Sequence, residues 1–443
     1  LDAYDETVAA AQETLQREIR SKVSKEDPMS ILLLFEVVMQ EPEYQFPTDA
    51  LADAAFYILS RNSGEGKDRT VSKGDFQLTD TEIRDIKDIA SSYDRMMLVL
   101  NVCGVVDLTP VLDDVPNILL LSQPGMAVGD AFADVILGKS FPSGKLSGTW
   151  AKWEDYCQVG DFGEEDDTRY REGIYVGYRY FDTMDVTPSF PFGYGLSYTT
   201  FSFASTEISN EKSDIMVRAR VENTGRYPGK ETMQLYVAKP SVALDQPYQV
   251  LAAFAKTEEL LPGENQTLEL KFDMASLASF DAHRSMKILE KGDYTLLLGR
   301  DSRATVCVGM ISLNEEICVE KVAHVGGEAD FEDLVPDQAK VYLPQVELNV
   351  PVLSLKGDDF TAEPVQKETD VPEEILRLTE QMSNEELAKL CVGGYIQTGS
   401  KSIIGAAGIH VAGAAGETTS LEERGIRPLL MADRHPGVRV CRR

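Results

Sequence analysis

The chain is poor in histidine, in paired cysteines and in long apolar runs. Its 443 residues include 4 histidines and 6 cysteines. The histidines stand far apart, so no HExxH motif or paired-histidine zinc site can be drawn. The cysteines follow neither pairwise nor metal-ligand spacing, which favours free thiols in a reducing compartment. We therefore expect no metal, no cofactor and a cytoplasmic location.

Basic residues are scarce beside acidic ones. The chain has 43 Lys and Arg against 73 Asp and Glu, a formal net charge of -30. The field of such a chain repels polyanions, which argues against nucleic acid and anionic membranes as partners. No run approaches the ~18 apolar residues that cross a bilayer, and the first residues lack the pattern of a signal peptide. A neutral substrate or partner fits better, and homo-oligomerisation stays open.

What the chain does contain is enough apolar sequence to fold. Hydrophobic residues make up 43% and charged residues 26%, which excludes wholesale disorder. On the scale of ~100–200 residues per domain, the length predicts two or three domains. Apolar β-prone runs at 54–59, 95–102 and 115–121 alternate with helical patterns at 81–90 and 128–137. This alternation predicts a parallel, doubly wound α/β sheet.

The loop after the first of these strands is the strongest candidate for chemistry. It reads Ser-Arg-Asn-Ser-Gly-Glu-Gly-Lys-Asp-Arg over residues 60–69. Open α/β sheets bind ligands at the carboxyl ends of their strands, and the flanking glycines let the backbone bend so that Glu65 projects. The alternative is a solvated loop in which Glu65 pairs with charged neighbours, and composition alone favours it. The loop does not meet the phosphate-binding pattern GxxxxGK[ST], and Glu65 would repel phosphate.

The middle of the chain predicts an antiparallel β-sandwich. From 201 to 313, short alternating runs are separated by turn sequences, as in sandwiches of roughly a hundred residues. Just before it, aromatic residues alternate with glycine at 175–181 and 190–198. Such blocks suit either a sugar-stacking surface or packing at a domain edge, and packing is favoured.

The last third of the chain is less regular. Residues 325–374 are acidic and rich in Pro and Gly, typical of a linker that holds at most one strand, at 346–352. An amphipathic helix with an internal cap at Ser383 follows at 372–390. The run 427–433 then predicts a strand that ends in the carboxylate of Asp433.

These motifs, in this order, resemble glycoside hydrolase family 3, the β-glucosidase family, in the rearranged type whose α/β domain precedes its barrel. The resemblance implies four segments: an α/β sandwich domain, incomplete at its N-terminus (1–198), a fibronectin type III-like domain (199–315), a linker (316–374) and the start of a truncated (β/α)8 barrel (375–443). It is carried by the acid/base-like loop 63–69, the turn 141–146, the junction motifs 175–180 and 191–198, the sandwich motifs 221–225 and 234–237, and the barrel-opening motifs 406–408, 414–418 and 432–433.

The resemblance implies a retaining hydrolase that cleaves O-glycosyl bonds of β-glucosides or related small β-glycosides. In such enzymes one carboxylate attacks the anomeric carbon and a second, ~5–5.5 Å away, protonates the leaving oxygen. Glu65 matches the general acid/base, which needs a raised pKa. Asp433 matches the carboxylate that binds sugar hydroxyls in the primary subsite. The expected partner is a small oligosaccharide or β-glucoside.

The sequence also departs from the family pattern. A (β/α)8 barrel needs ~250 residues, and only its first strand precedes Arg443. The family's nucleophilic aspartate has no counterpart, Arg434 stands where the family has Gly, and Ser140 stands where it has Asn. We therefore expect a fragment that alone is weak or inactive. The alternative is a non-catalytic carbohydrate-binding or interaction fragment, which would bind sugar without turnover.

Overall fold

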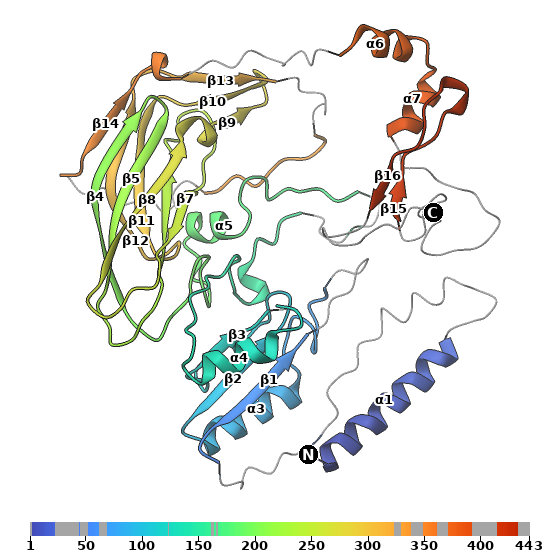
Figure 1. Cartoon of the computed structure of the whole chain (residues 1–443), viewed down its shortest axis with the longest axis vertical. Coiled ribbons are helices and arrows are strands. Elements are labelled where there is room, and N and C mark those ends of the chain that lie inside the picture. Colours follow the sequence, from blue (N-terminus) through green and yellow to red (C-terminus); the bar gives the residue numbers. More distant parts are fainter. Residues whose placement is uncertain are drawn as a thin grey trace. The chain divides into compact units, whose positions relative to one another are not determined.

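The computed structural model describes most of the chain (Figure 1). It divides into two compact units, one formed by Glu43–Val365 and the other by Leu1–Pro42 together with Gln366–Arg443. The described residues are 2–22, 44, 52–61, 69–122, 124–160, 164, 167–322, 329–337, 349–360, 371–391 and 414–432.

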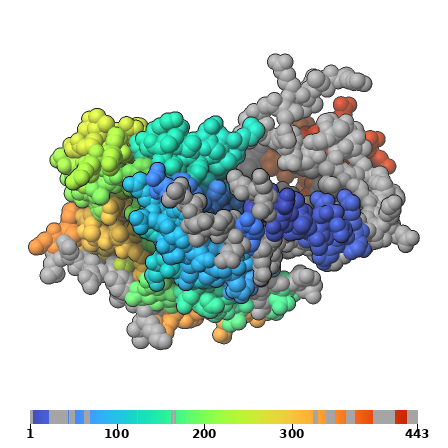
Figure 2. Space-filling view, turned by 90° about the horizontal axis from the view of Figure 1, so that it is seen from below, coloured from blue at the N-terminus to red at the C-terminus, as the bar shows by residue number. Residues whose placement is uncertain are grey.

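The larger unit begins with the predicted parallel α/β sheet. Strands β1 (Ala55–Ser60), β2 (Met96–Asn101) and β3 (Ile118–Leu120) are hydrogen-bonded in that order and run parallel. Helix α3 (Asp80–Ser92) follows β1, and α4 (Val128–Ile136) follows β3. In Figure 2 this α/β part forms one continuous surface, coloured light blue to teal. The α/β prediction is confirmed.

The two helices lie on opposite faces of this sheet. Successive side chains of a strand point to opposite faces, so different residues of β1 contact each helix. Leu59 of β1 packs in one apolar cluster with Ile86 of α3. On the other face, the ring of Phe56 meets that of Phe132 in α4 edge-on, with centroids 5.8 Å apart. Both faces of β1 are therefore contacted, as a parallel sheet requires.

The sandwich that follows consists of three sheets, and its presence confirms the predicted all-β part. One sheet has the order β14-β12-β11-β6-β7, a second β4-β5-β8 and a third β13-β10-β9. The strands are β4 (Phe201–Glu211), β5 (Asp214–Asn223), β6 (Thr232–Ala238), β7 (Val250–Lys256), β8 (Asn265–Asp273), β9 (Ser279–Asp281), β10 (Met286–Leu289), β11 (Gly292–Gly299), β12 (Thr305–Leu313), β13 (Ile317–Lys321) and β14 (Val352–Leu355).

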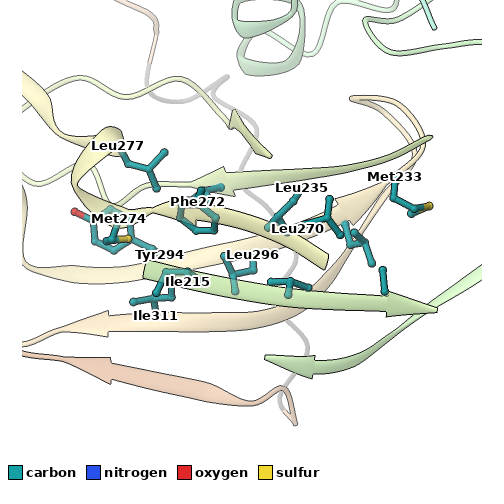
Figure 3. Packing of buried hydrophobic residues seen from close by; sticks show 14 of the residues in the cluster. Ile215, Met233, Leu235, Leu270, Phe272, Met274, Leu277, Tyr294, Leu296 and Ile311 are labelled. Carbon is teal, nitrogen blue, oxygen red and sulfur yellow. The ribbon is translucent and has the colours of Figure 1, made fainter. Parts of the chain in front are cut away.

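The main core of the sandwich is a large apolar cluster, part of which is shown in Figure 3. Burial alternates along strand β5, as its sequence pattern predicts, and Ile215 is one of the buried residues. Leu270 of β8 lies in the same cluster. Leu235 of β6 and Leu296 of β11 are fully buried there. Each such side chain contributes roughly 1.5–3 kcal/mol through burial.

Two strands lie within the range that the sequence predicts as a linker. Strand β13 pairs antiparallel with β10, and β14 pairs parallel with β12. Residues 346–348 of the strand predicted at 346–352 lie outside the described residues, and residues 349–351 are not in a strand. The strand β14 begins only at Val352. The sandwich sheets thus extend beyond residue 315, because the acidic segment returns to fill an edge position.

The aromatic junction packs internally. Helix α5 (Tyr178–Thr183) places the ring of Tyr178 against Phe192, with centroids 4.6 Å apart, and against Tyr236, at 5.9 Å. The backbone N–H of Leu251 donates to the Tyr178 hydroxyl at 2.9 Å. For these rings the packing interpretation is confirmed over the sugar-stacking one.

The smaller unit holds helices and one hairpin. The pattern at 372–390 predicts one helix, but the structure has two, because Ser383 and Glu386 form a cap that starts the second. In the part of the chain that the structure describes, no helix is long and apolar enough to span a bilayer. The elements are α1 (Asp2–Lys22), α6 (Glu373–Glu380), α7 (Asn384–Cys391), β15 (Ala414–Glu417) and β16 (Leu430–Ala432), with β15 antiparallel to β16.

Candidate active site

Both site residues predicted from the sequence, Glu65 and Asp433, lie outside the described residues. The structure does describe the two ends of the segment that carries Glu65. The first end is Arg61, which follows the last residue of β1, and the second is Arg69. The backbone N–H of Arg61 donates to the carbonyl of Asn101 at the end of β2. The first end therefore lies at the carboxyl edge of the parallel sheet, where α/β proteins bind ligands.

Arg61 is a buried cation with a full set of acceptors. Its side chain is 6% exposed and that of Glu82 is 7% exposed. The guanidinium makes a bidentate pair with Glu82, with Nη1 to Oε1 at 2.7 Å and Nη2 to Oε2 at 2.8 Å. Its Nε donates to the carbonyl of Asp75 at 2.9 Å. Removing one member of such a buried pair costs about 3–5 kcal/mol, because the other charge is left uncompensated.

The same glutamate also starts helix α3. Glu82 Oε2 accepts from the backbone N–H of Thr79 at 2.8 Å, and Thr79 Oγ1 accepts from the N–H of Glu82 at 3.0 Å. This reciprocal capping box satisfies two backbone donors at the helix start. Arg61 is thereby connected through one carboxylate to the first turn of α3.

The second end of the segment is held by Asp75. Arg69 Nε donates to Asp75 Oδ1 at 2.7 Å, and the backbone N–H of Thr70 donates to Oδ2 at 2.6 Å. Arg69 Nη1 donates to the carbonyl of Val105 at 2.5 Å. A Cβ on Gly104 would lie 2.9 Å from that same Nη1, so the guanidinium lies directly on the backbone there.

The surroundings of Asp75 keep its carboxyl ionised. Burial is the largest single influence on its pKa and would raise it. The hydrogen bond from the Thr70 amide and the hydrogen bond and charge of Arg69 together outweigh burial, so the pKa of Asp75 lies below its ordinary value. At neutral pH, Asp75 is therefore a carboxylate that accepts from both Arg69 and Thr70.

The charged groups around Asp75 are paired with one another. Among the described residues, no group of three or more His, Cys, Asp or Glu could hold a metal ion. A surface hollow of about 410 Å³ on α6 is lined by Glu373, Glu374, Arg377, Leu378 and Gln381. All of these come from one helix and its end, so the hollow lacks the convergent groups of a site.

The residues that form the contacts at the two ends of the segment were not identified from the sequence. The capping box of Thr79 and Glu82 is visible as a T-x-x-E pattern, but nothing in the sequence says that Glu82 also binds Arg61. Asp75 lies in a turn with no motif of its own, and its two contacts with the ends of the segment exist only in the folded chain.

Comparison with known proteins fits this geometry. A model of the glycosyl hydrolase family 3 C-terminal domain matches residues 6–198, and one of the fibronectin type III-like domain matches residues 231–302. Over these residues the chain is similar to glycoside hydrolase family 3. The resemblance inferred from the motifs is therefore confirmed.

The curated relatives that this chain resembles are larger proteins. β-Glucosidase A of Butyrivibrio fibrisolvens is 37% identical over 342 residues, which are 65% of this chain and 41% of that protein. A β-glucosidase of Ruminococcus albus is 35% identical over 261 residues, 57% of this chain and 28% of that protein.

Solved structures of β-glucosidases are similar to this chain in fold. A β-glucosidase from Paenibacillus barengoltzii matches with a TM-score of 0.66 and 29% identity, over 86% of this chain and 45% of that one. β-Glucosidase 3B from Thermotoga neapolitana, solved in complex with glucose, matches with a TM-score of 0.59 and 34% identity, over 69% and 44%. The chain thus spans less than half the length of these relatives.

Proposed function

We propose that this chain supplies the acid/base part of a retaining glycosidase that hydrolyses O-glycosyl bonds of β-glucosides or related small β-glycosides. The observation that carries the proposal is the set of contacts at the two ends of the 62–68 segment. One end is fixed at the carboxyl edge of the parallel sheet, and both ends bind Asp75, in a chain that is similar to family 3. The names of the relatives, which are β-glucosidases, support the substrate class.

In this proposal Glu65 is the general acid and then the general base. It protonates the glycosidic oxygen as the first bond breaks, and it later takes a proton from the water that releases the sugar. A carboxyl that donates near neutral pH needs a raised pKa, which a free cation nearby would oppose. Arg61 is paired with Glu82 and Arg69 with Asp75, so these two cations are already neutralised. Lys67 would also oppose a raised pKa unless it turns outward, and it lies outside the described residues.

The remaining parts of the site are assigned by the resemblance. We propose that 375–443 is the start of the catalytic barrel, with Asp433 accepting hydrogen bonds from hydroxyls of the bound sugar. The described pieces of this range are α6, α7 and the β15 and β16 hairpin. The nucleophilic carboxylate is not assigned to any residue of this sequence.

The expected substrate, cellular location and oligomeric state are part of the same proposal. A sugar substrate is supported by the glucose complex of a structural relative. A cytoplasmic location fits the described cysteines, which are free thiols at Cys103, Cys157, Cys307, Cys318 and Cys391. Homo-oligomerisation stays an expectation.

The test is hydrolysis of 4-nitrophenyl β-D-glucoside. Three proteins are compared: this chain, the chain extended through a complete barrel, and the extended form with Glu65→Gln. We expect turnover in the extended form and a loss of about 10²–10⁴-fold in kcat when Glu65 is replaced. Glu258→Gln, an exposed glutamate of the sandwich, is the matched control and should keep full activity.

Two outcomes would contradict the proposal. Full activity of the extended Glu65→Gln protein would remove Glu65 from the chemistry. Measurable sugar affinity without turnover in the extended form would favour the alternative, a non-catalytic carbohydrate-binding fragment.

A further inference from the structure

We propose that Trp153 is a binding platform for a neutral, β-linked glucose oligosaccharide, one pyranose ring of which stacks on the exposed indole. The ligand class rests on the proposed function, whereas the binding itself does not involve Glu65. Trp153 lies in the α/β part, in a short 3₁₀ turn, η2 (Trp153–Asp155). This turn lies between two motifs that carry the family resemblance, at 141–146 and 175–180, and belongs to neither.

The first observation is that this tryptophan is exposed. The chain has 2 tryptophans. Trp150 is 7% exposed and lies in the apolar cluster of the α/β part, whereas Trp153 is 36% exposed. Tryptophan is highly buried on average, because its large ring gains much from leaving water. The exposed indole therefore has a surface that the described fold does not use.

The second observation is that neighbouring rings fix the indole. The Trp153 ring meets Phe76 at a centroid distance of 5.9 Å and Tyr156 at 6.3 Å. Tyr156 in turn meets Phe181 of α5 edge-on at 5.2 Å, and Phe181 is 1% exposed. Single exposed apolar side chains are common and carry no function by themselves. Trp153 differs from these because its ring is already held in place, so that binding costs little side-chain entropy.

Hydrogen bonds hold the turn as well. The carbonyl of Trp153 accepts from the N–H of Tyr156 at 3.1 Å and from Gln158 Nε2 at 2.7 Å. The hydroxyl of Tyr156 donates to the carbonyl of Thr149 at 2.7 Å. The backbone of the turn and the ring that supports the indole are therefore fixed together.

The third observation is the place of this ring cluster in the fold. The carbonyl of Phe76 accepts from the N–H of Asp107, in the loop that follows β2, at 2.8 Å. The preceding residue, Asp75, accepts from Arg61, which directly follows β1. Through Phe76, the indole of Trp153 is thus connected to the carboxyl edge of the parallel sheet, where open α/β sheets bind ligands.

The chemistry of the turn fits a neutral sugar. The C–H groups of a pyranose ring carry a partial positive charge, which the negative face of an aromatic ring attracts. In β-linked glucose the hydroxyls are equatorial, so both faces of the ring present such C–H groups. The same turn carries Lys152 and Asp155, whose side chains are 47% and 28% exposed and whose Nζ and Oδ1 are 3.5 Å apart. This loose pair can donate to and accept from sugar hydroxyls, whereas the net charge of -30 disfavours an anionic ligand.

The first measurement is an NMR titration of this chain with ¹⁵N-labelled indole groups. Each of the 2 tryptophans gives one indole N–H signal, and Trp153→Phe removes one signal and so assigns both. Cellobiose, and laminaribiose as a second β-linked probe, should shift the Trp153 signal saturably, with a Kd on the order of 1 mM. The Trp150 signal should stay in place. Mannitol, an acyclic polyol without a ring face, should shift neither signal.

Variants separate stacking from a general effect on the fold. Trp153→Ala should weaken cellobiose binding, measured by titration calorimetry, by about 10-fold or more, because the indole supplies the stacking surface. The matched control is Phe254→Ala, since Phe254 is 70% exposed but lies on β7 of the sandwich. It should bind cellobiose like the wild type.

A second variant keeps the test decisive if Trp153→Ala does not fold. Trp153→Phe keeps an aromatic ring for packing but offers a smaller face, so it should bind cellobiose several-fold more weakly than the wild type. Wild-type affinity in the Trp153 variants would overturn the proposal. So would the absence of any shift with both disaccharides, or an equal shift with mannitol.

A protein contact is the competing use of the exposed indole, because the chain spans less than half the length of its relatives. Acrylamide quenching of fluorescence distinguishes the two uses in the form extended through a complete barrel. Trp153 should stay open to acrylamide there, and quenching as weak as that of Trp150 would show a covered ring and overturn the proposal. Cellobiose binding without any glucosidase activity of the extended form would retain the platform and reject only the proposed chemistry.

Discussion

At the scale of single residues, Asp182 in α5 is a buried carboxyl with a raised pKa. It is 1% exposed. Gln249 Nε2 donates to its Oδ2 at 3.0 Å, and Ser302 Oγ lies 3.4 Å from Oδ1. Burial raises the pKa of Asp182 to about 6, although Gln249 and the charge of Arg303 pull it down. The folded protein therefore holds this proton at pH values where the unfolded chain has lost it.

This difference predicts a pH-dependent stability. Because the folded-state pKa is raised, stability should fall as pH rises from about 4 to about 6, by up to roughly 3 kcal/mol for a shift of ~2 units. Asp182→Asn should remove that slope and make the protein at least as stable as the wild type at pH 7.5. Urea unfolding at a series of pH values measures it. An unchanged slope in the variant would assign the dependence to another group.

At the scale of secondary-structure elements, the start of α3 combines folding and function. Glu82 caps the helix and neutralises Arg61 beside the Glu65 segment. One substitution there should affect both the helix start and the ion pair with Arg61.

Glu82→Gln tests this double role. The variant keeps a capping group but leaves Arg61 charged and buried, so we expect a loss of about 3–5 kcal/mol in the free energy of unfolding. Chemical denaturation measures it. Glu386→Gln is the control, because Glu386 also caps a helix and binds an arginine, but its partner Arg424 is 31% exposed. The control should cost less than about 1 kcal/mol.

The elements also show how far the sequence leads. Strand β5 and helix α3 were predictable, because their apolar residues follow periods of two and about 3.6. Strand β4 was not, since its residues are mostly exposed or half-buried and its sequence is mixed. Strand β14 joins the sheet only through a long-range parallel pairing. For the site, Glu65 followed from its loop and the family motif, whereas Asp75 acts through contacts that no local pattern encodes.

At the scale of the larger unit, the α/β part and the sandwich are joined by polar contacts. Gln234, 3% exposed, donates from Nε2 to the carbonyl of Gly193 at 3.1 Å and to that of Arg300 at 2.6 Å. Lys145 pairs with Glu231 at 2.8 Å and donates to the Gly195 carbonyl. These groups are largely buried, so we expect the two parts to unfold together.

Substitutions at two glycines distinguish a steric clash at the contact between the two parts from backbone strain alone. Gly193 has φ +81° and Gly263 has φ +83°, both in the left-handed region, where a side chain is unfavourable. A Cβ on Gly193 would lie 2.1 Å from Gln234 Oε1, whereas one on Gly263 would meet nothing within 4 Å.

Gly263→Ala should therefore cost only about 1 kcal/mol, the strain alone. Gly193→Ala should cost clearly more and broaden or split the thermal transition of the unit, which calorimetry measures. Equal costs for the two substitutions would show that Gln234 moves aside freely.

The hydrogen bonds of Asp75 with Arg61 and Arg69 also have a consequence for protein engineering. Arg61, Arg69 and Asp75, which are joined by these bonds, all lie outside residues 62–68. The sequence between the two arginines can therefore be varied without replacing any residue that makes these bonds. Libraries that vary only positions 62–68 should consequently keep a wild-type melting temperature while their catalytic properties diverge.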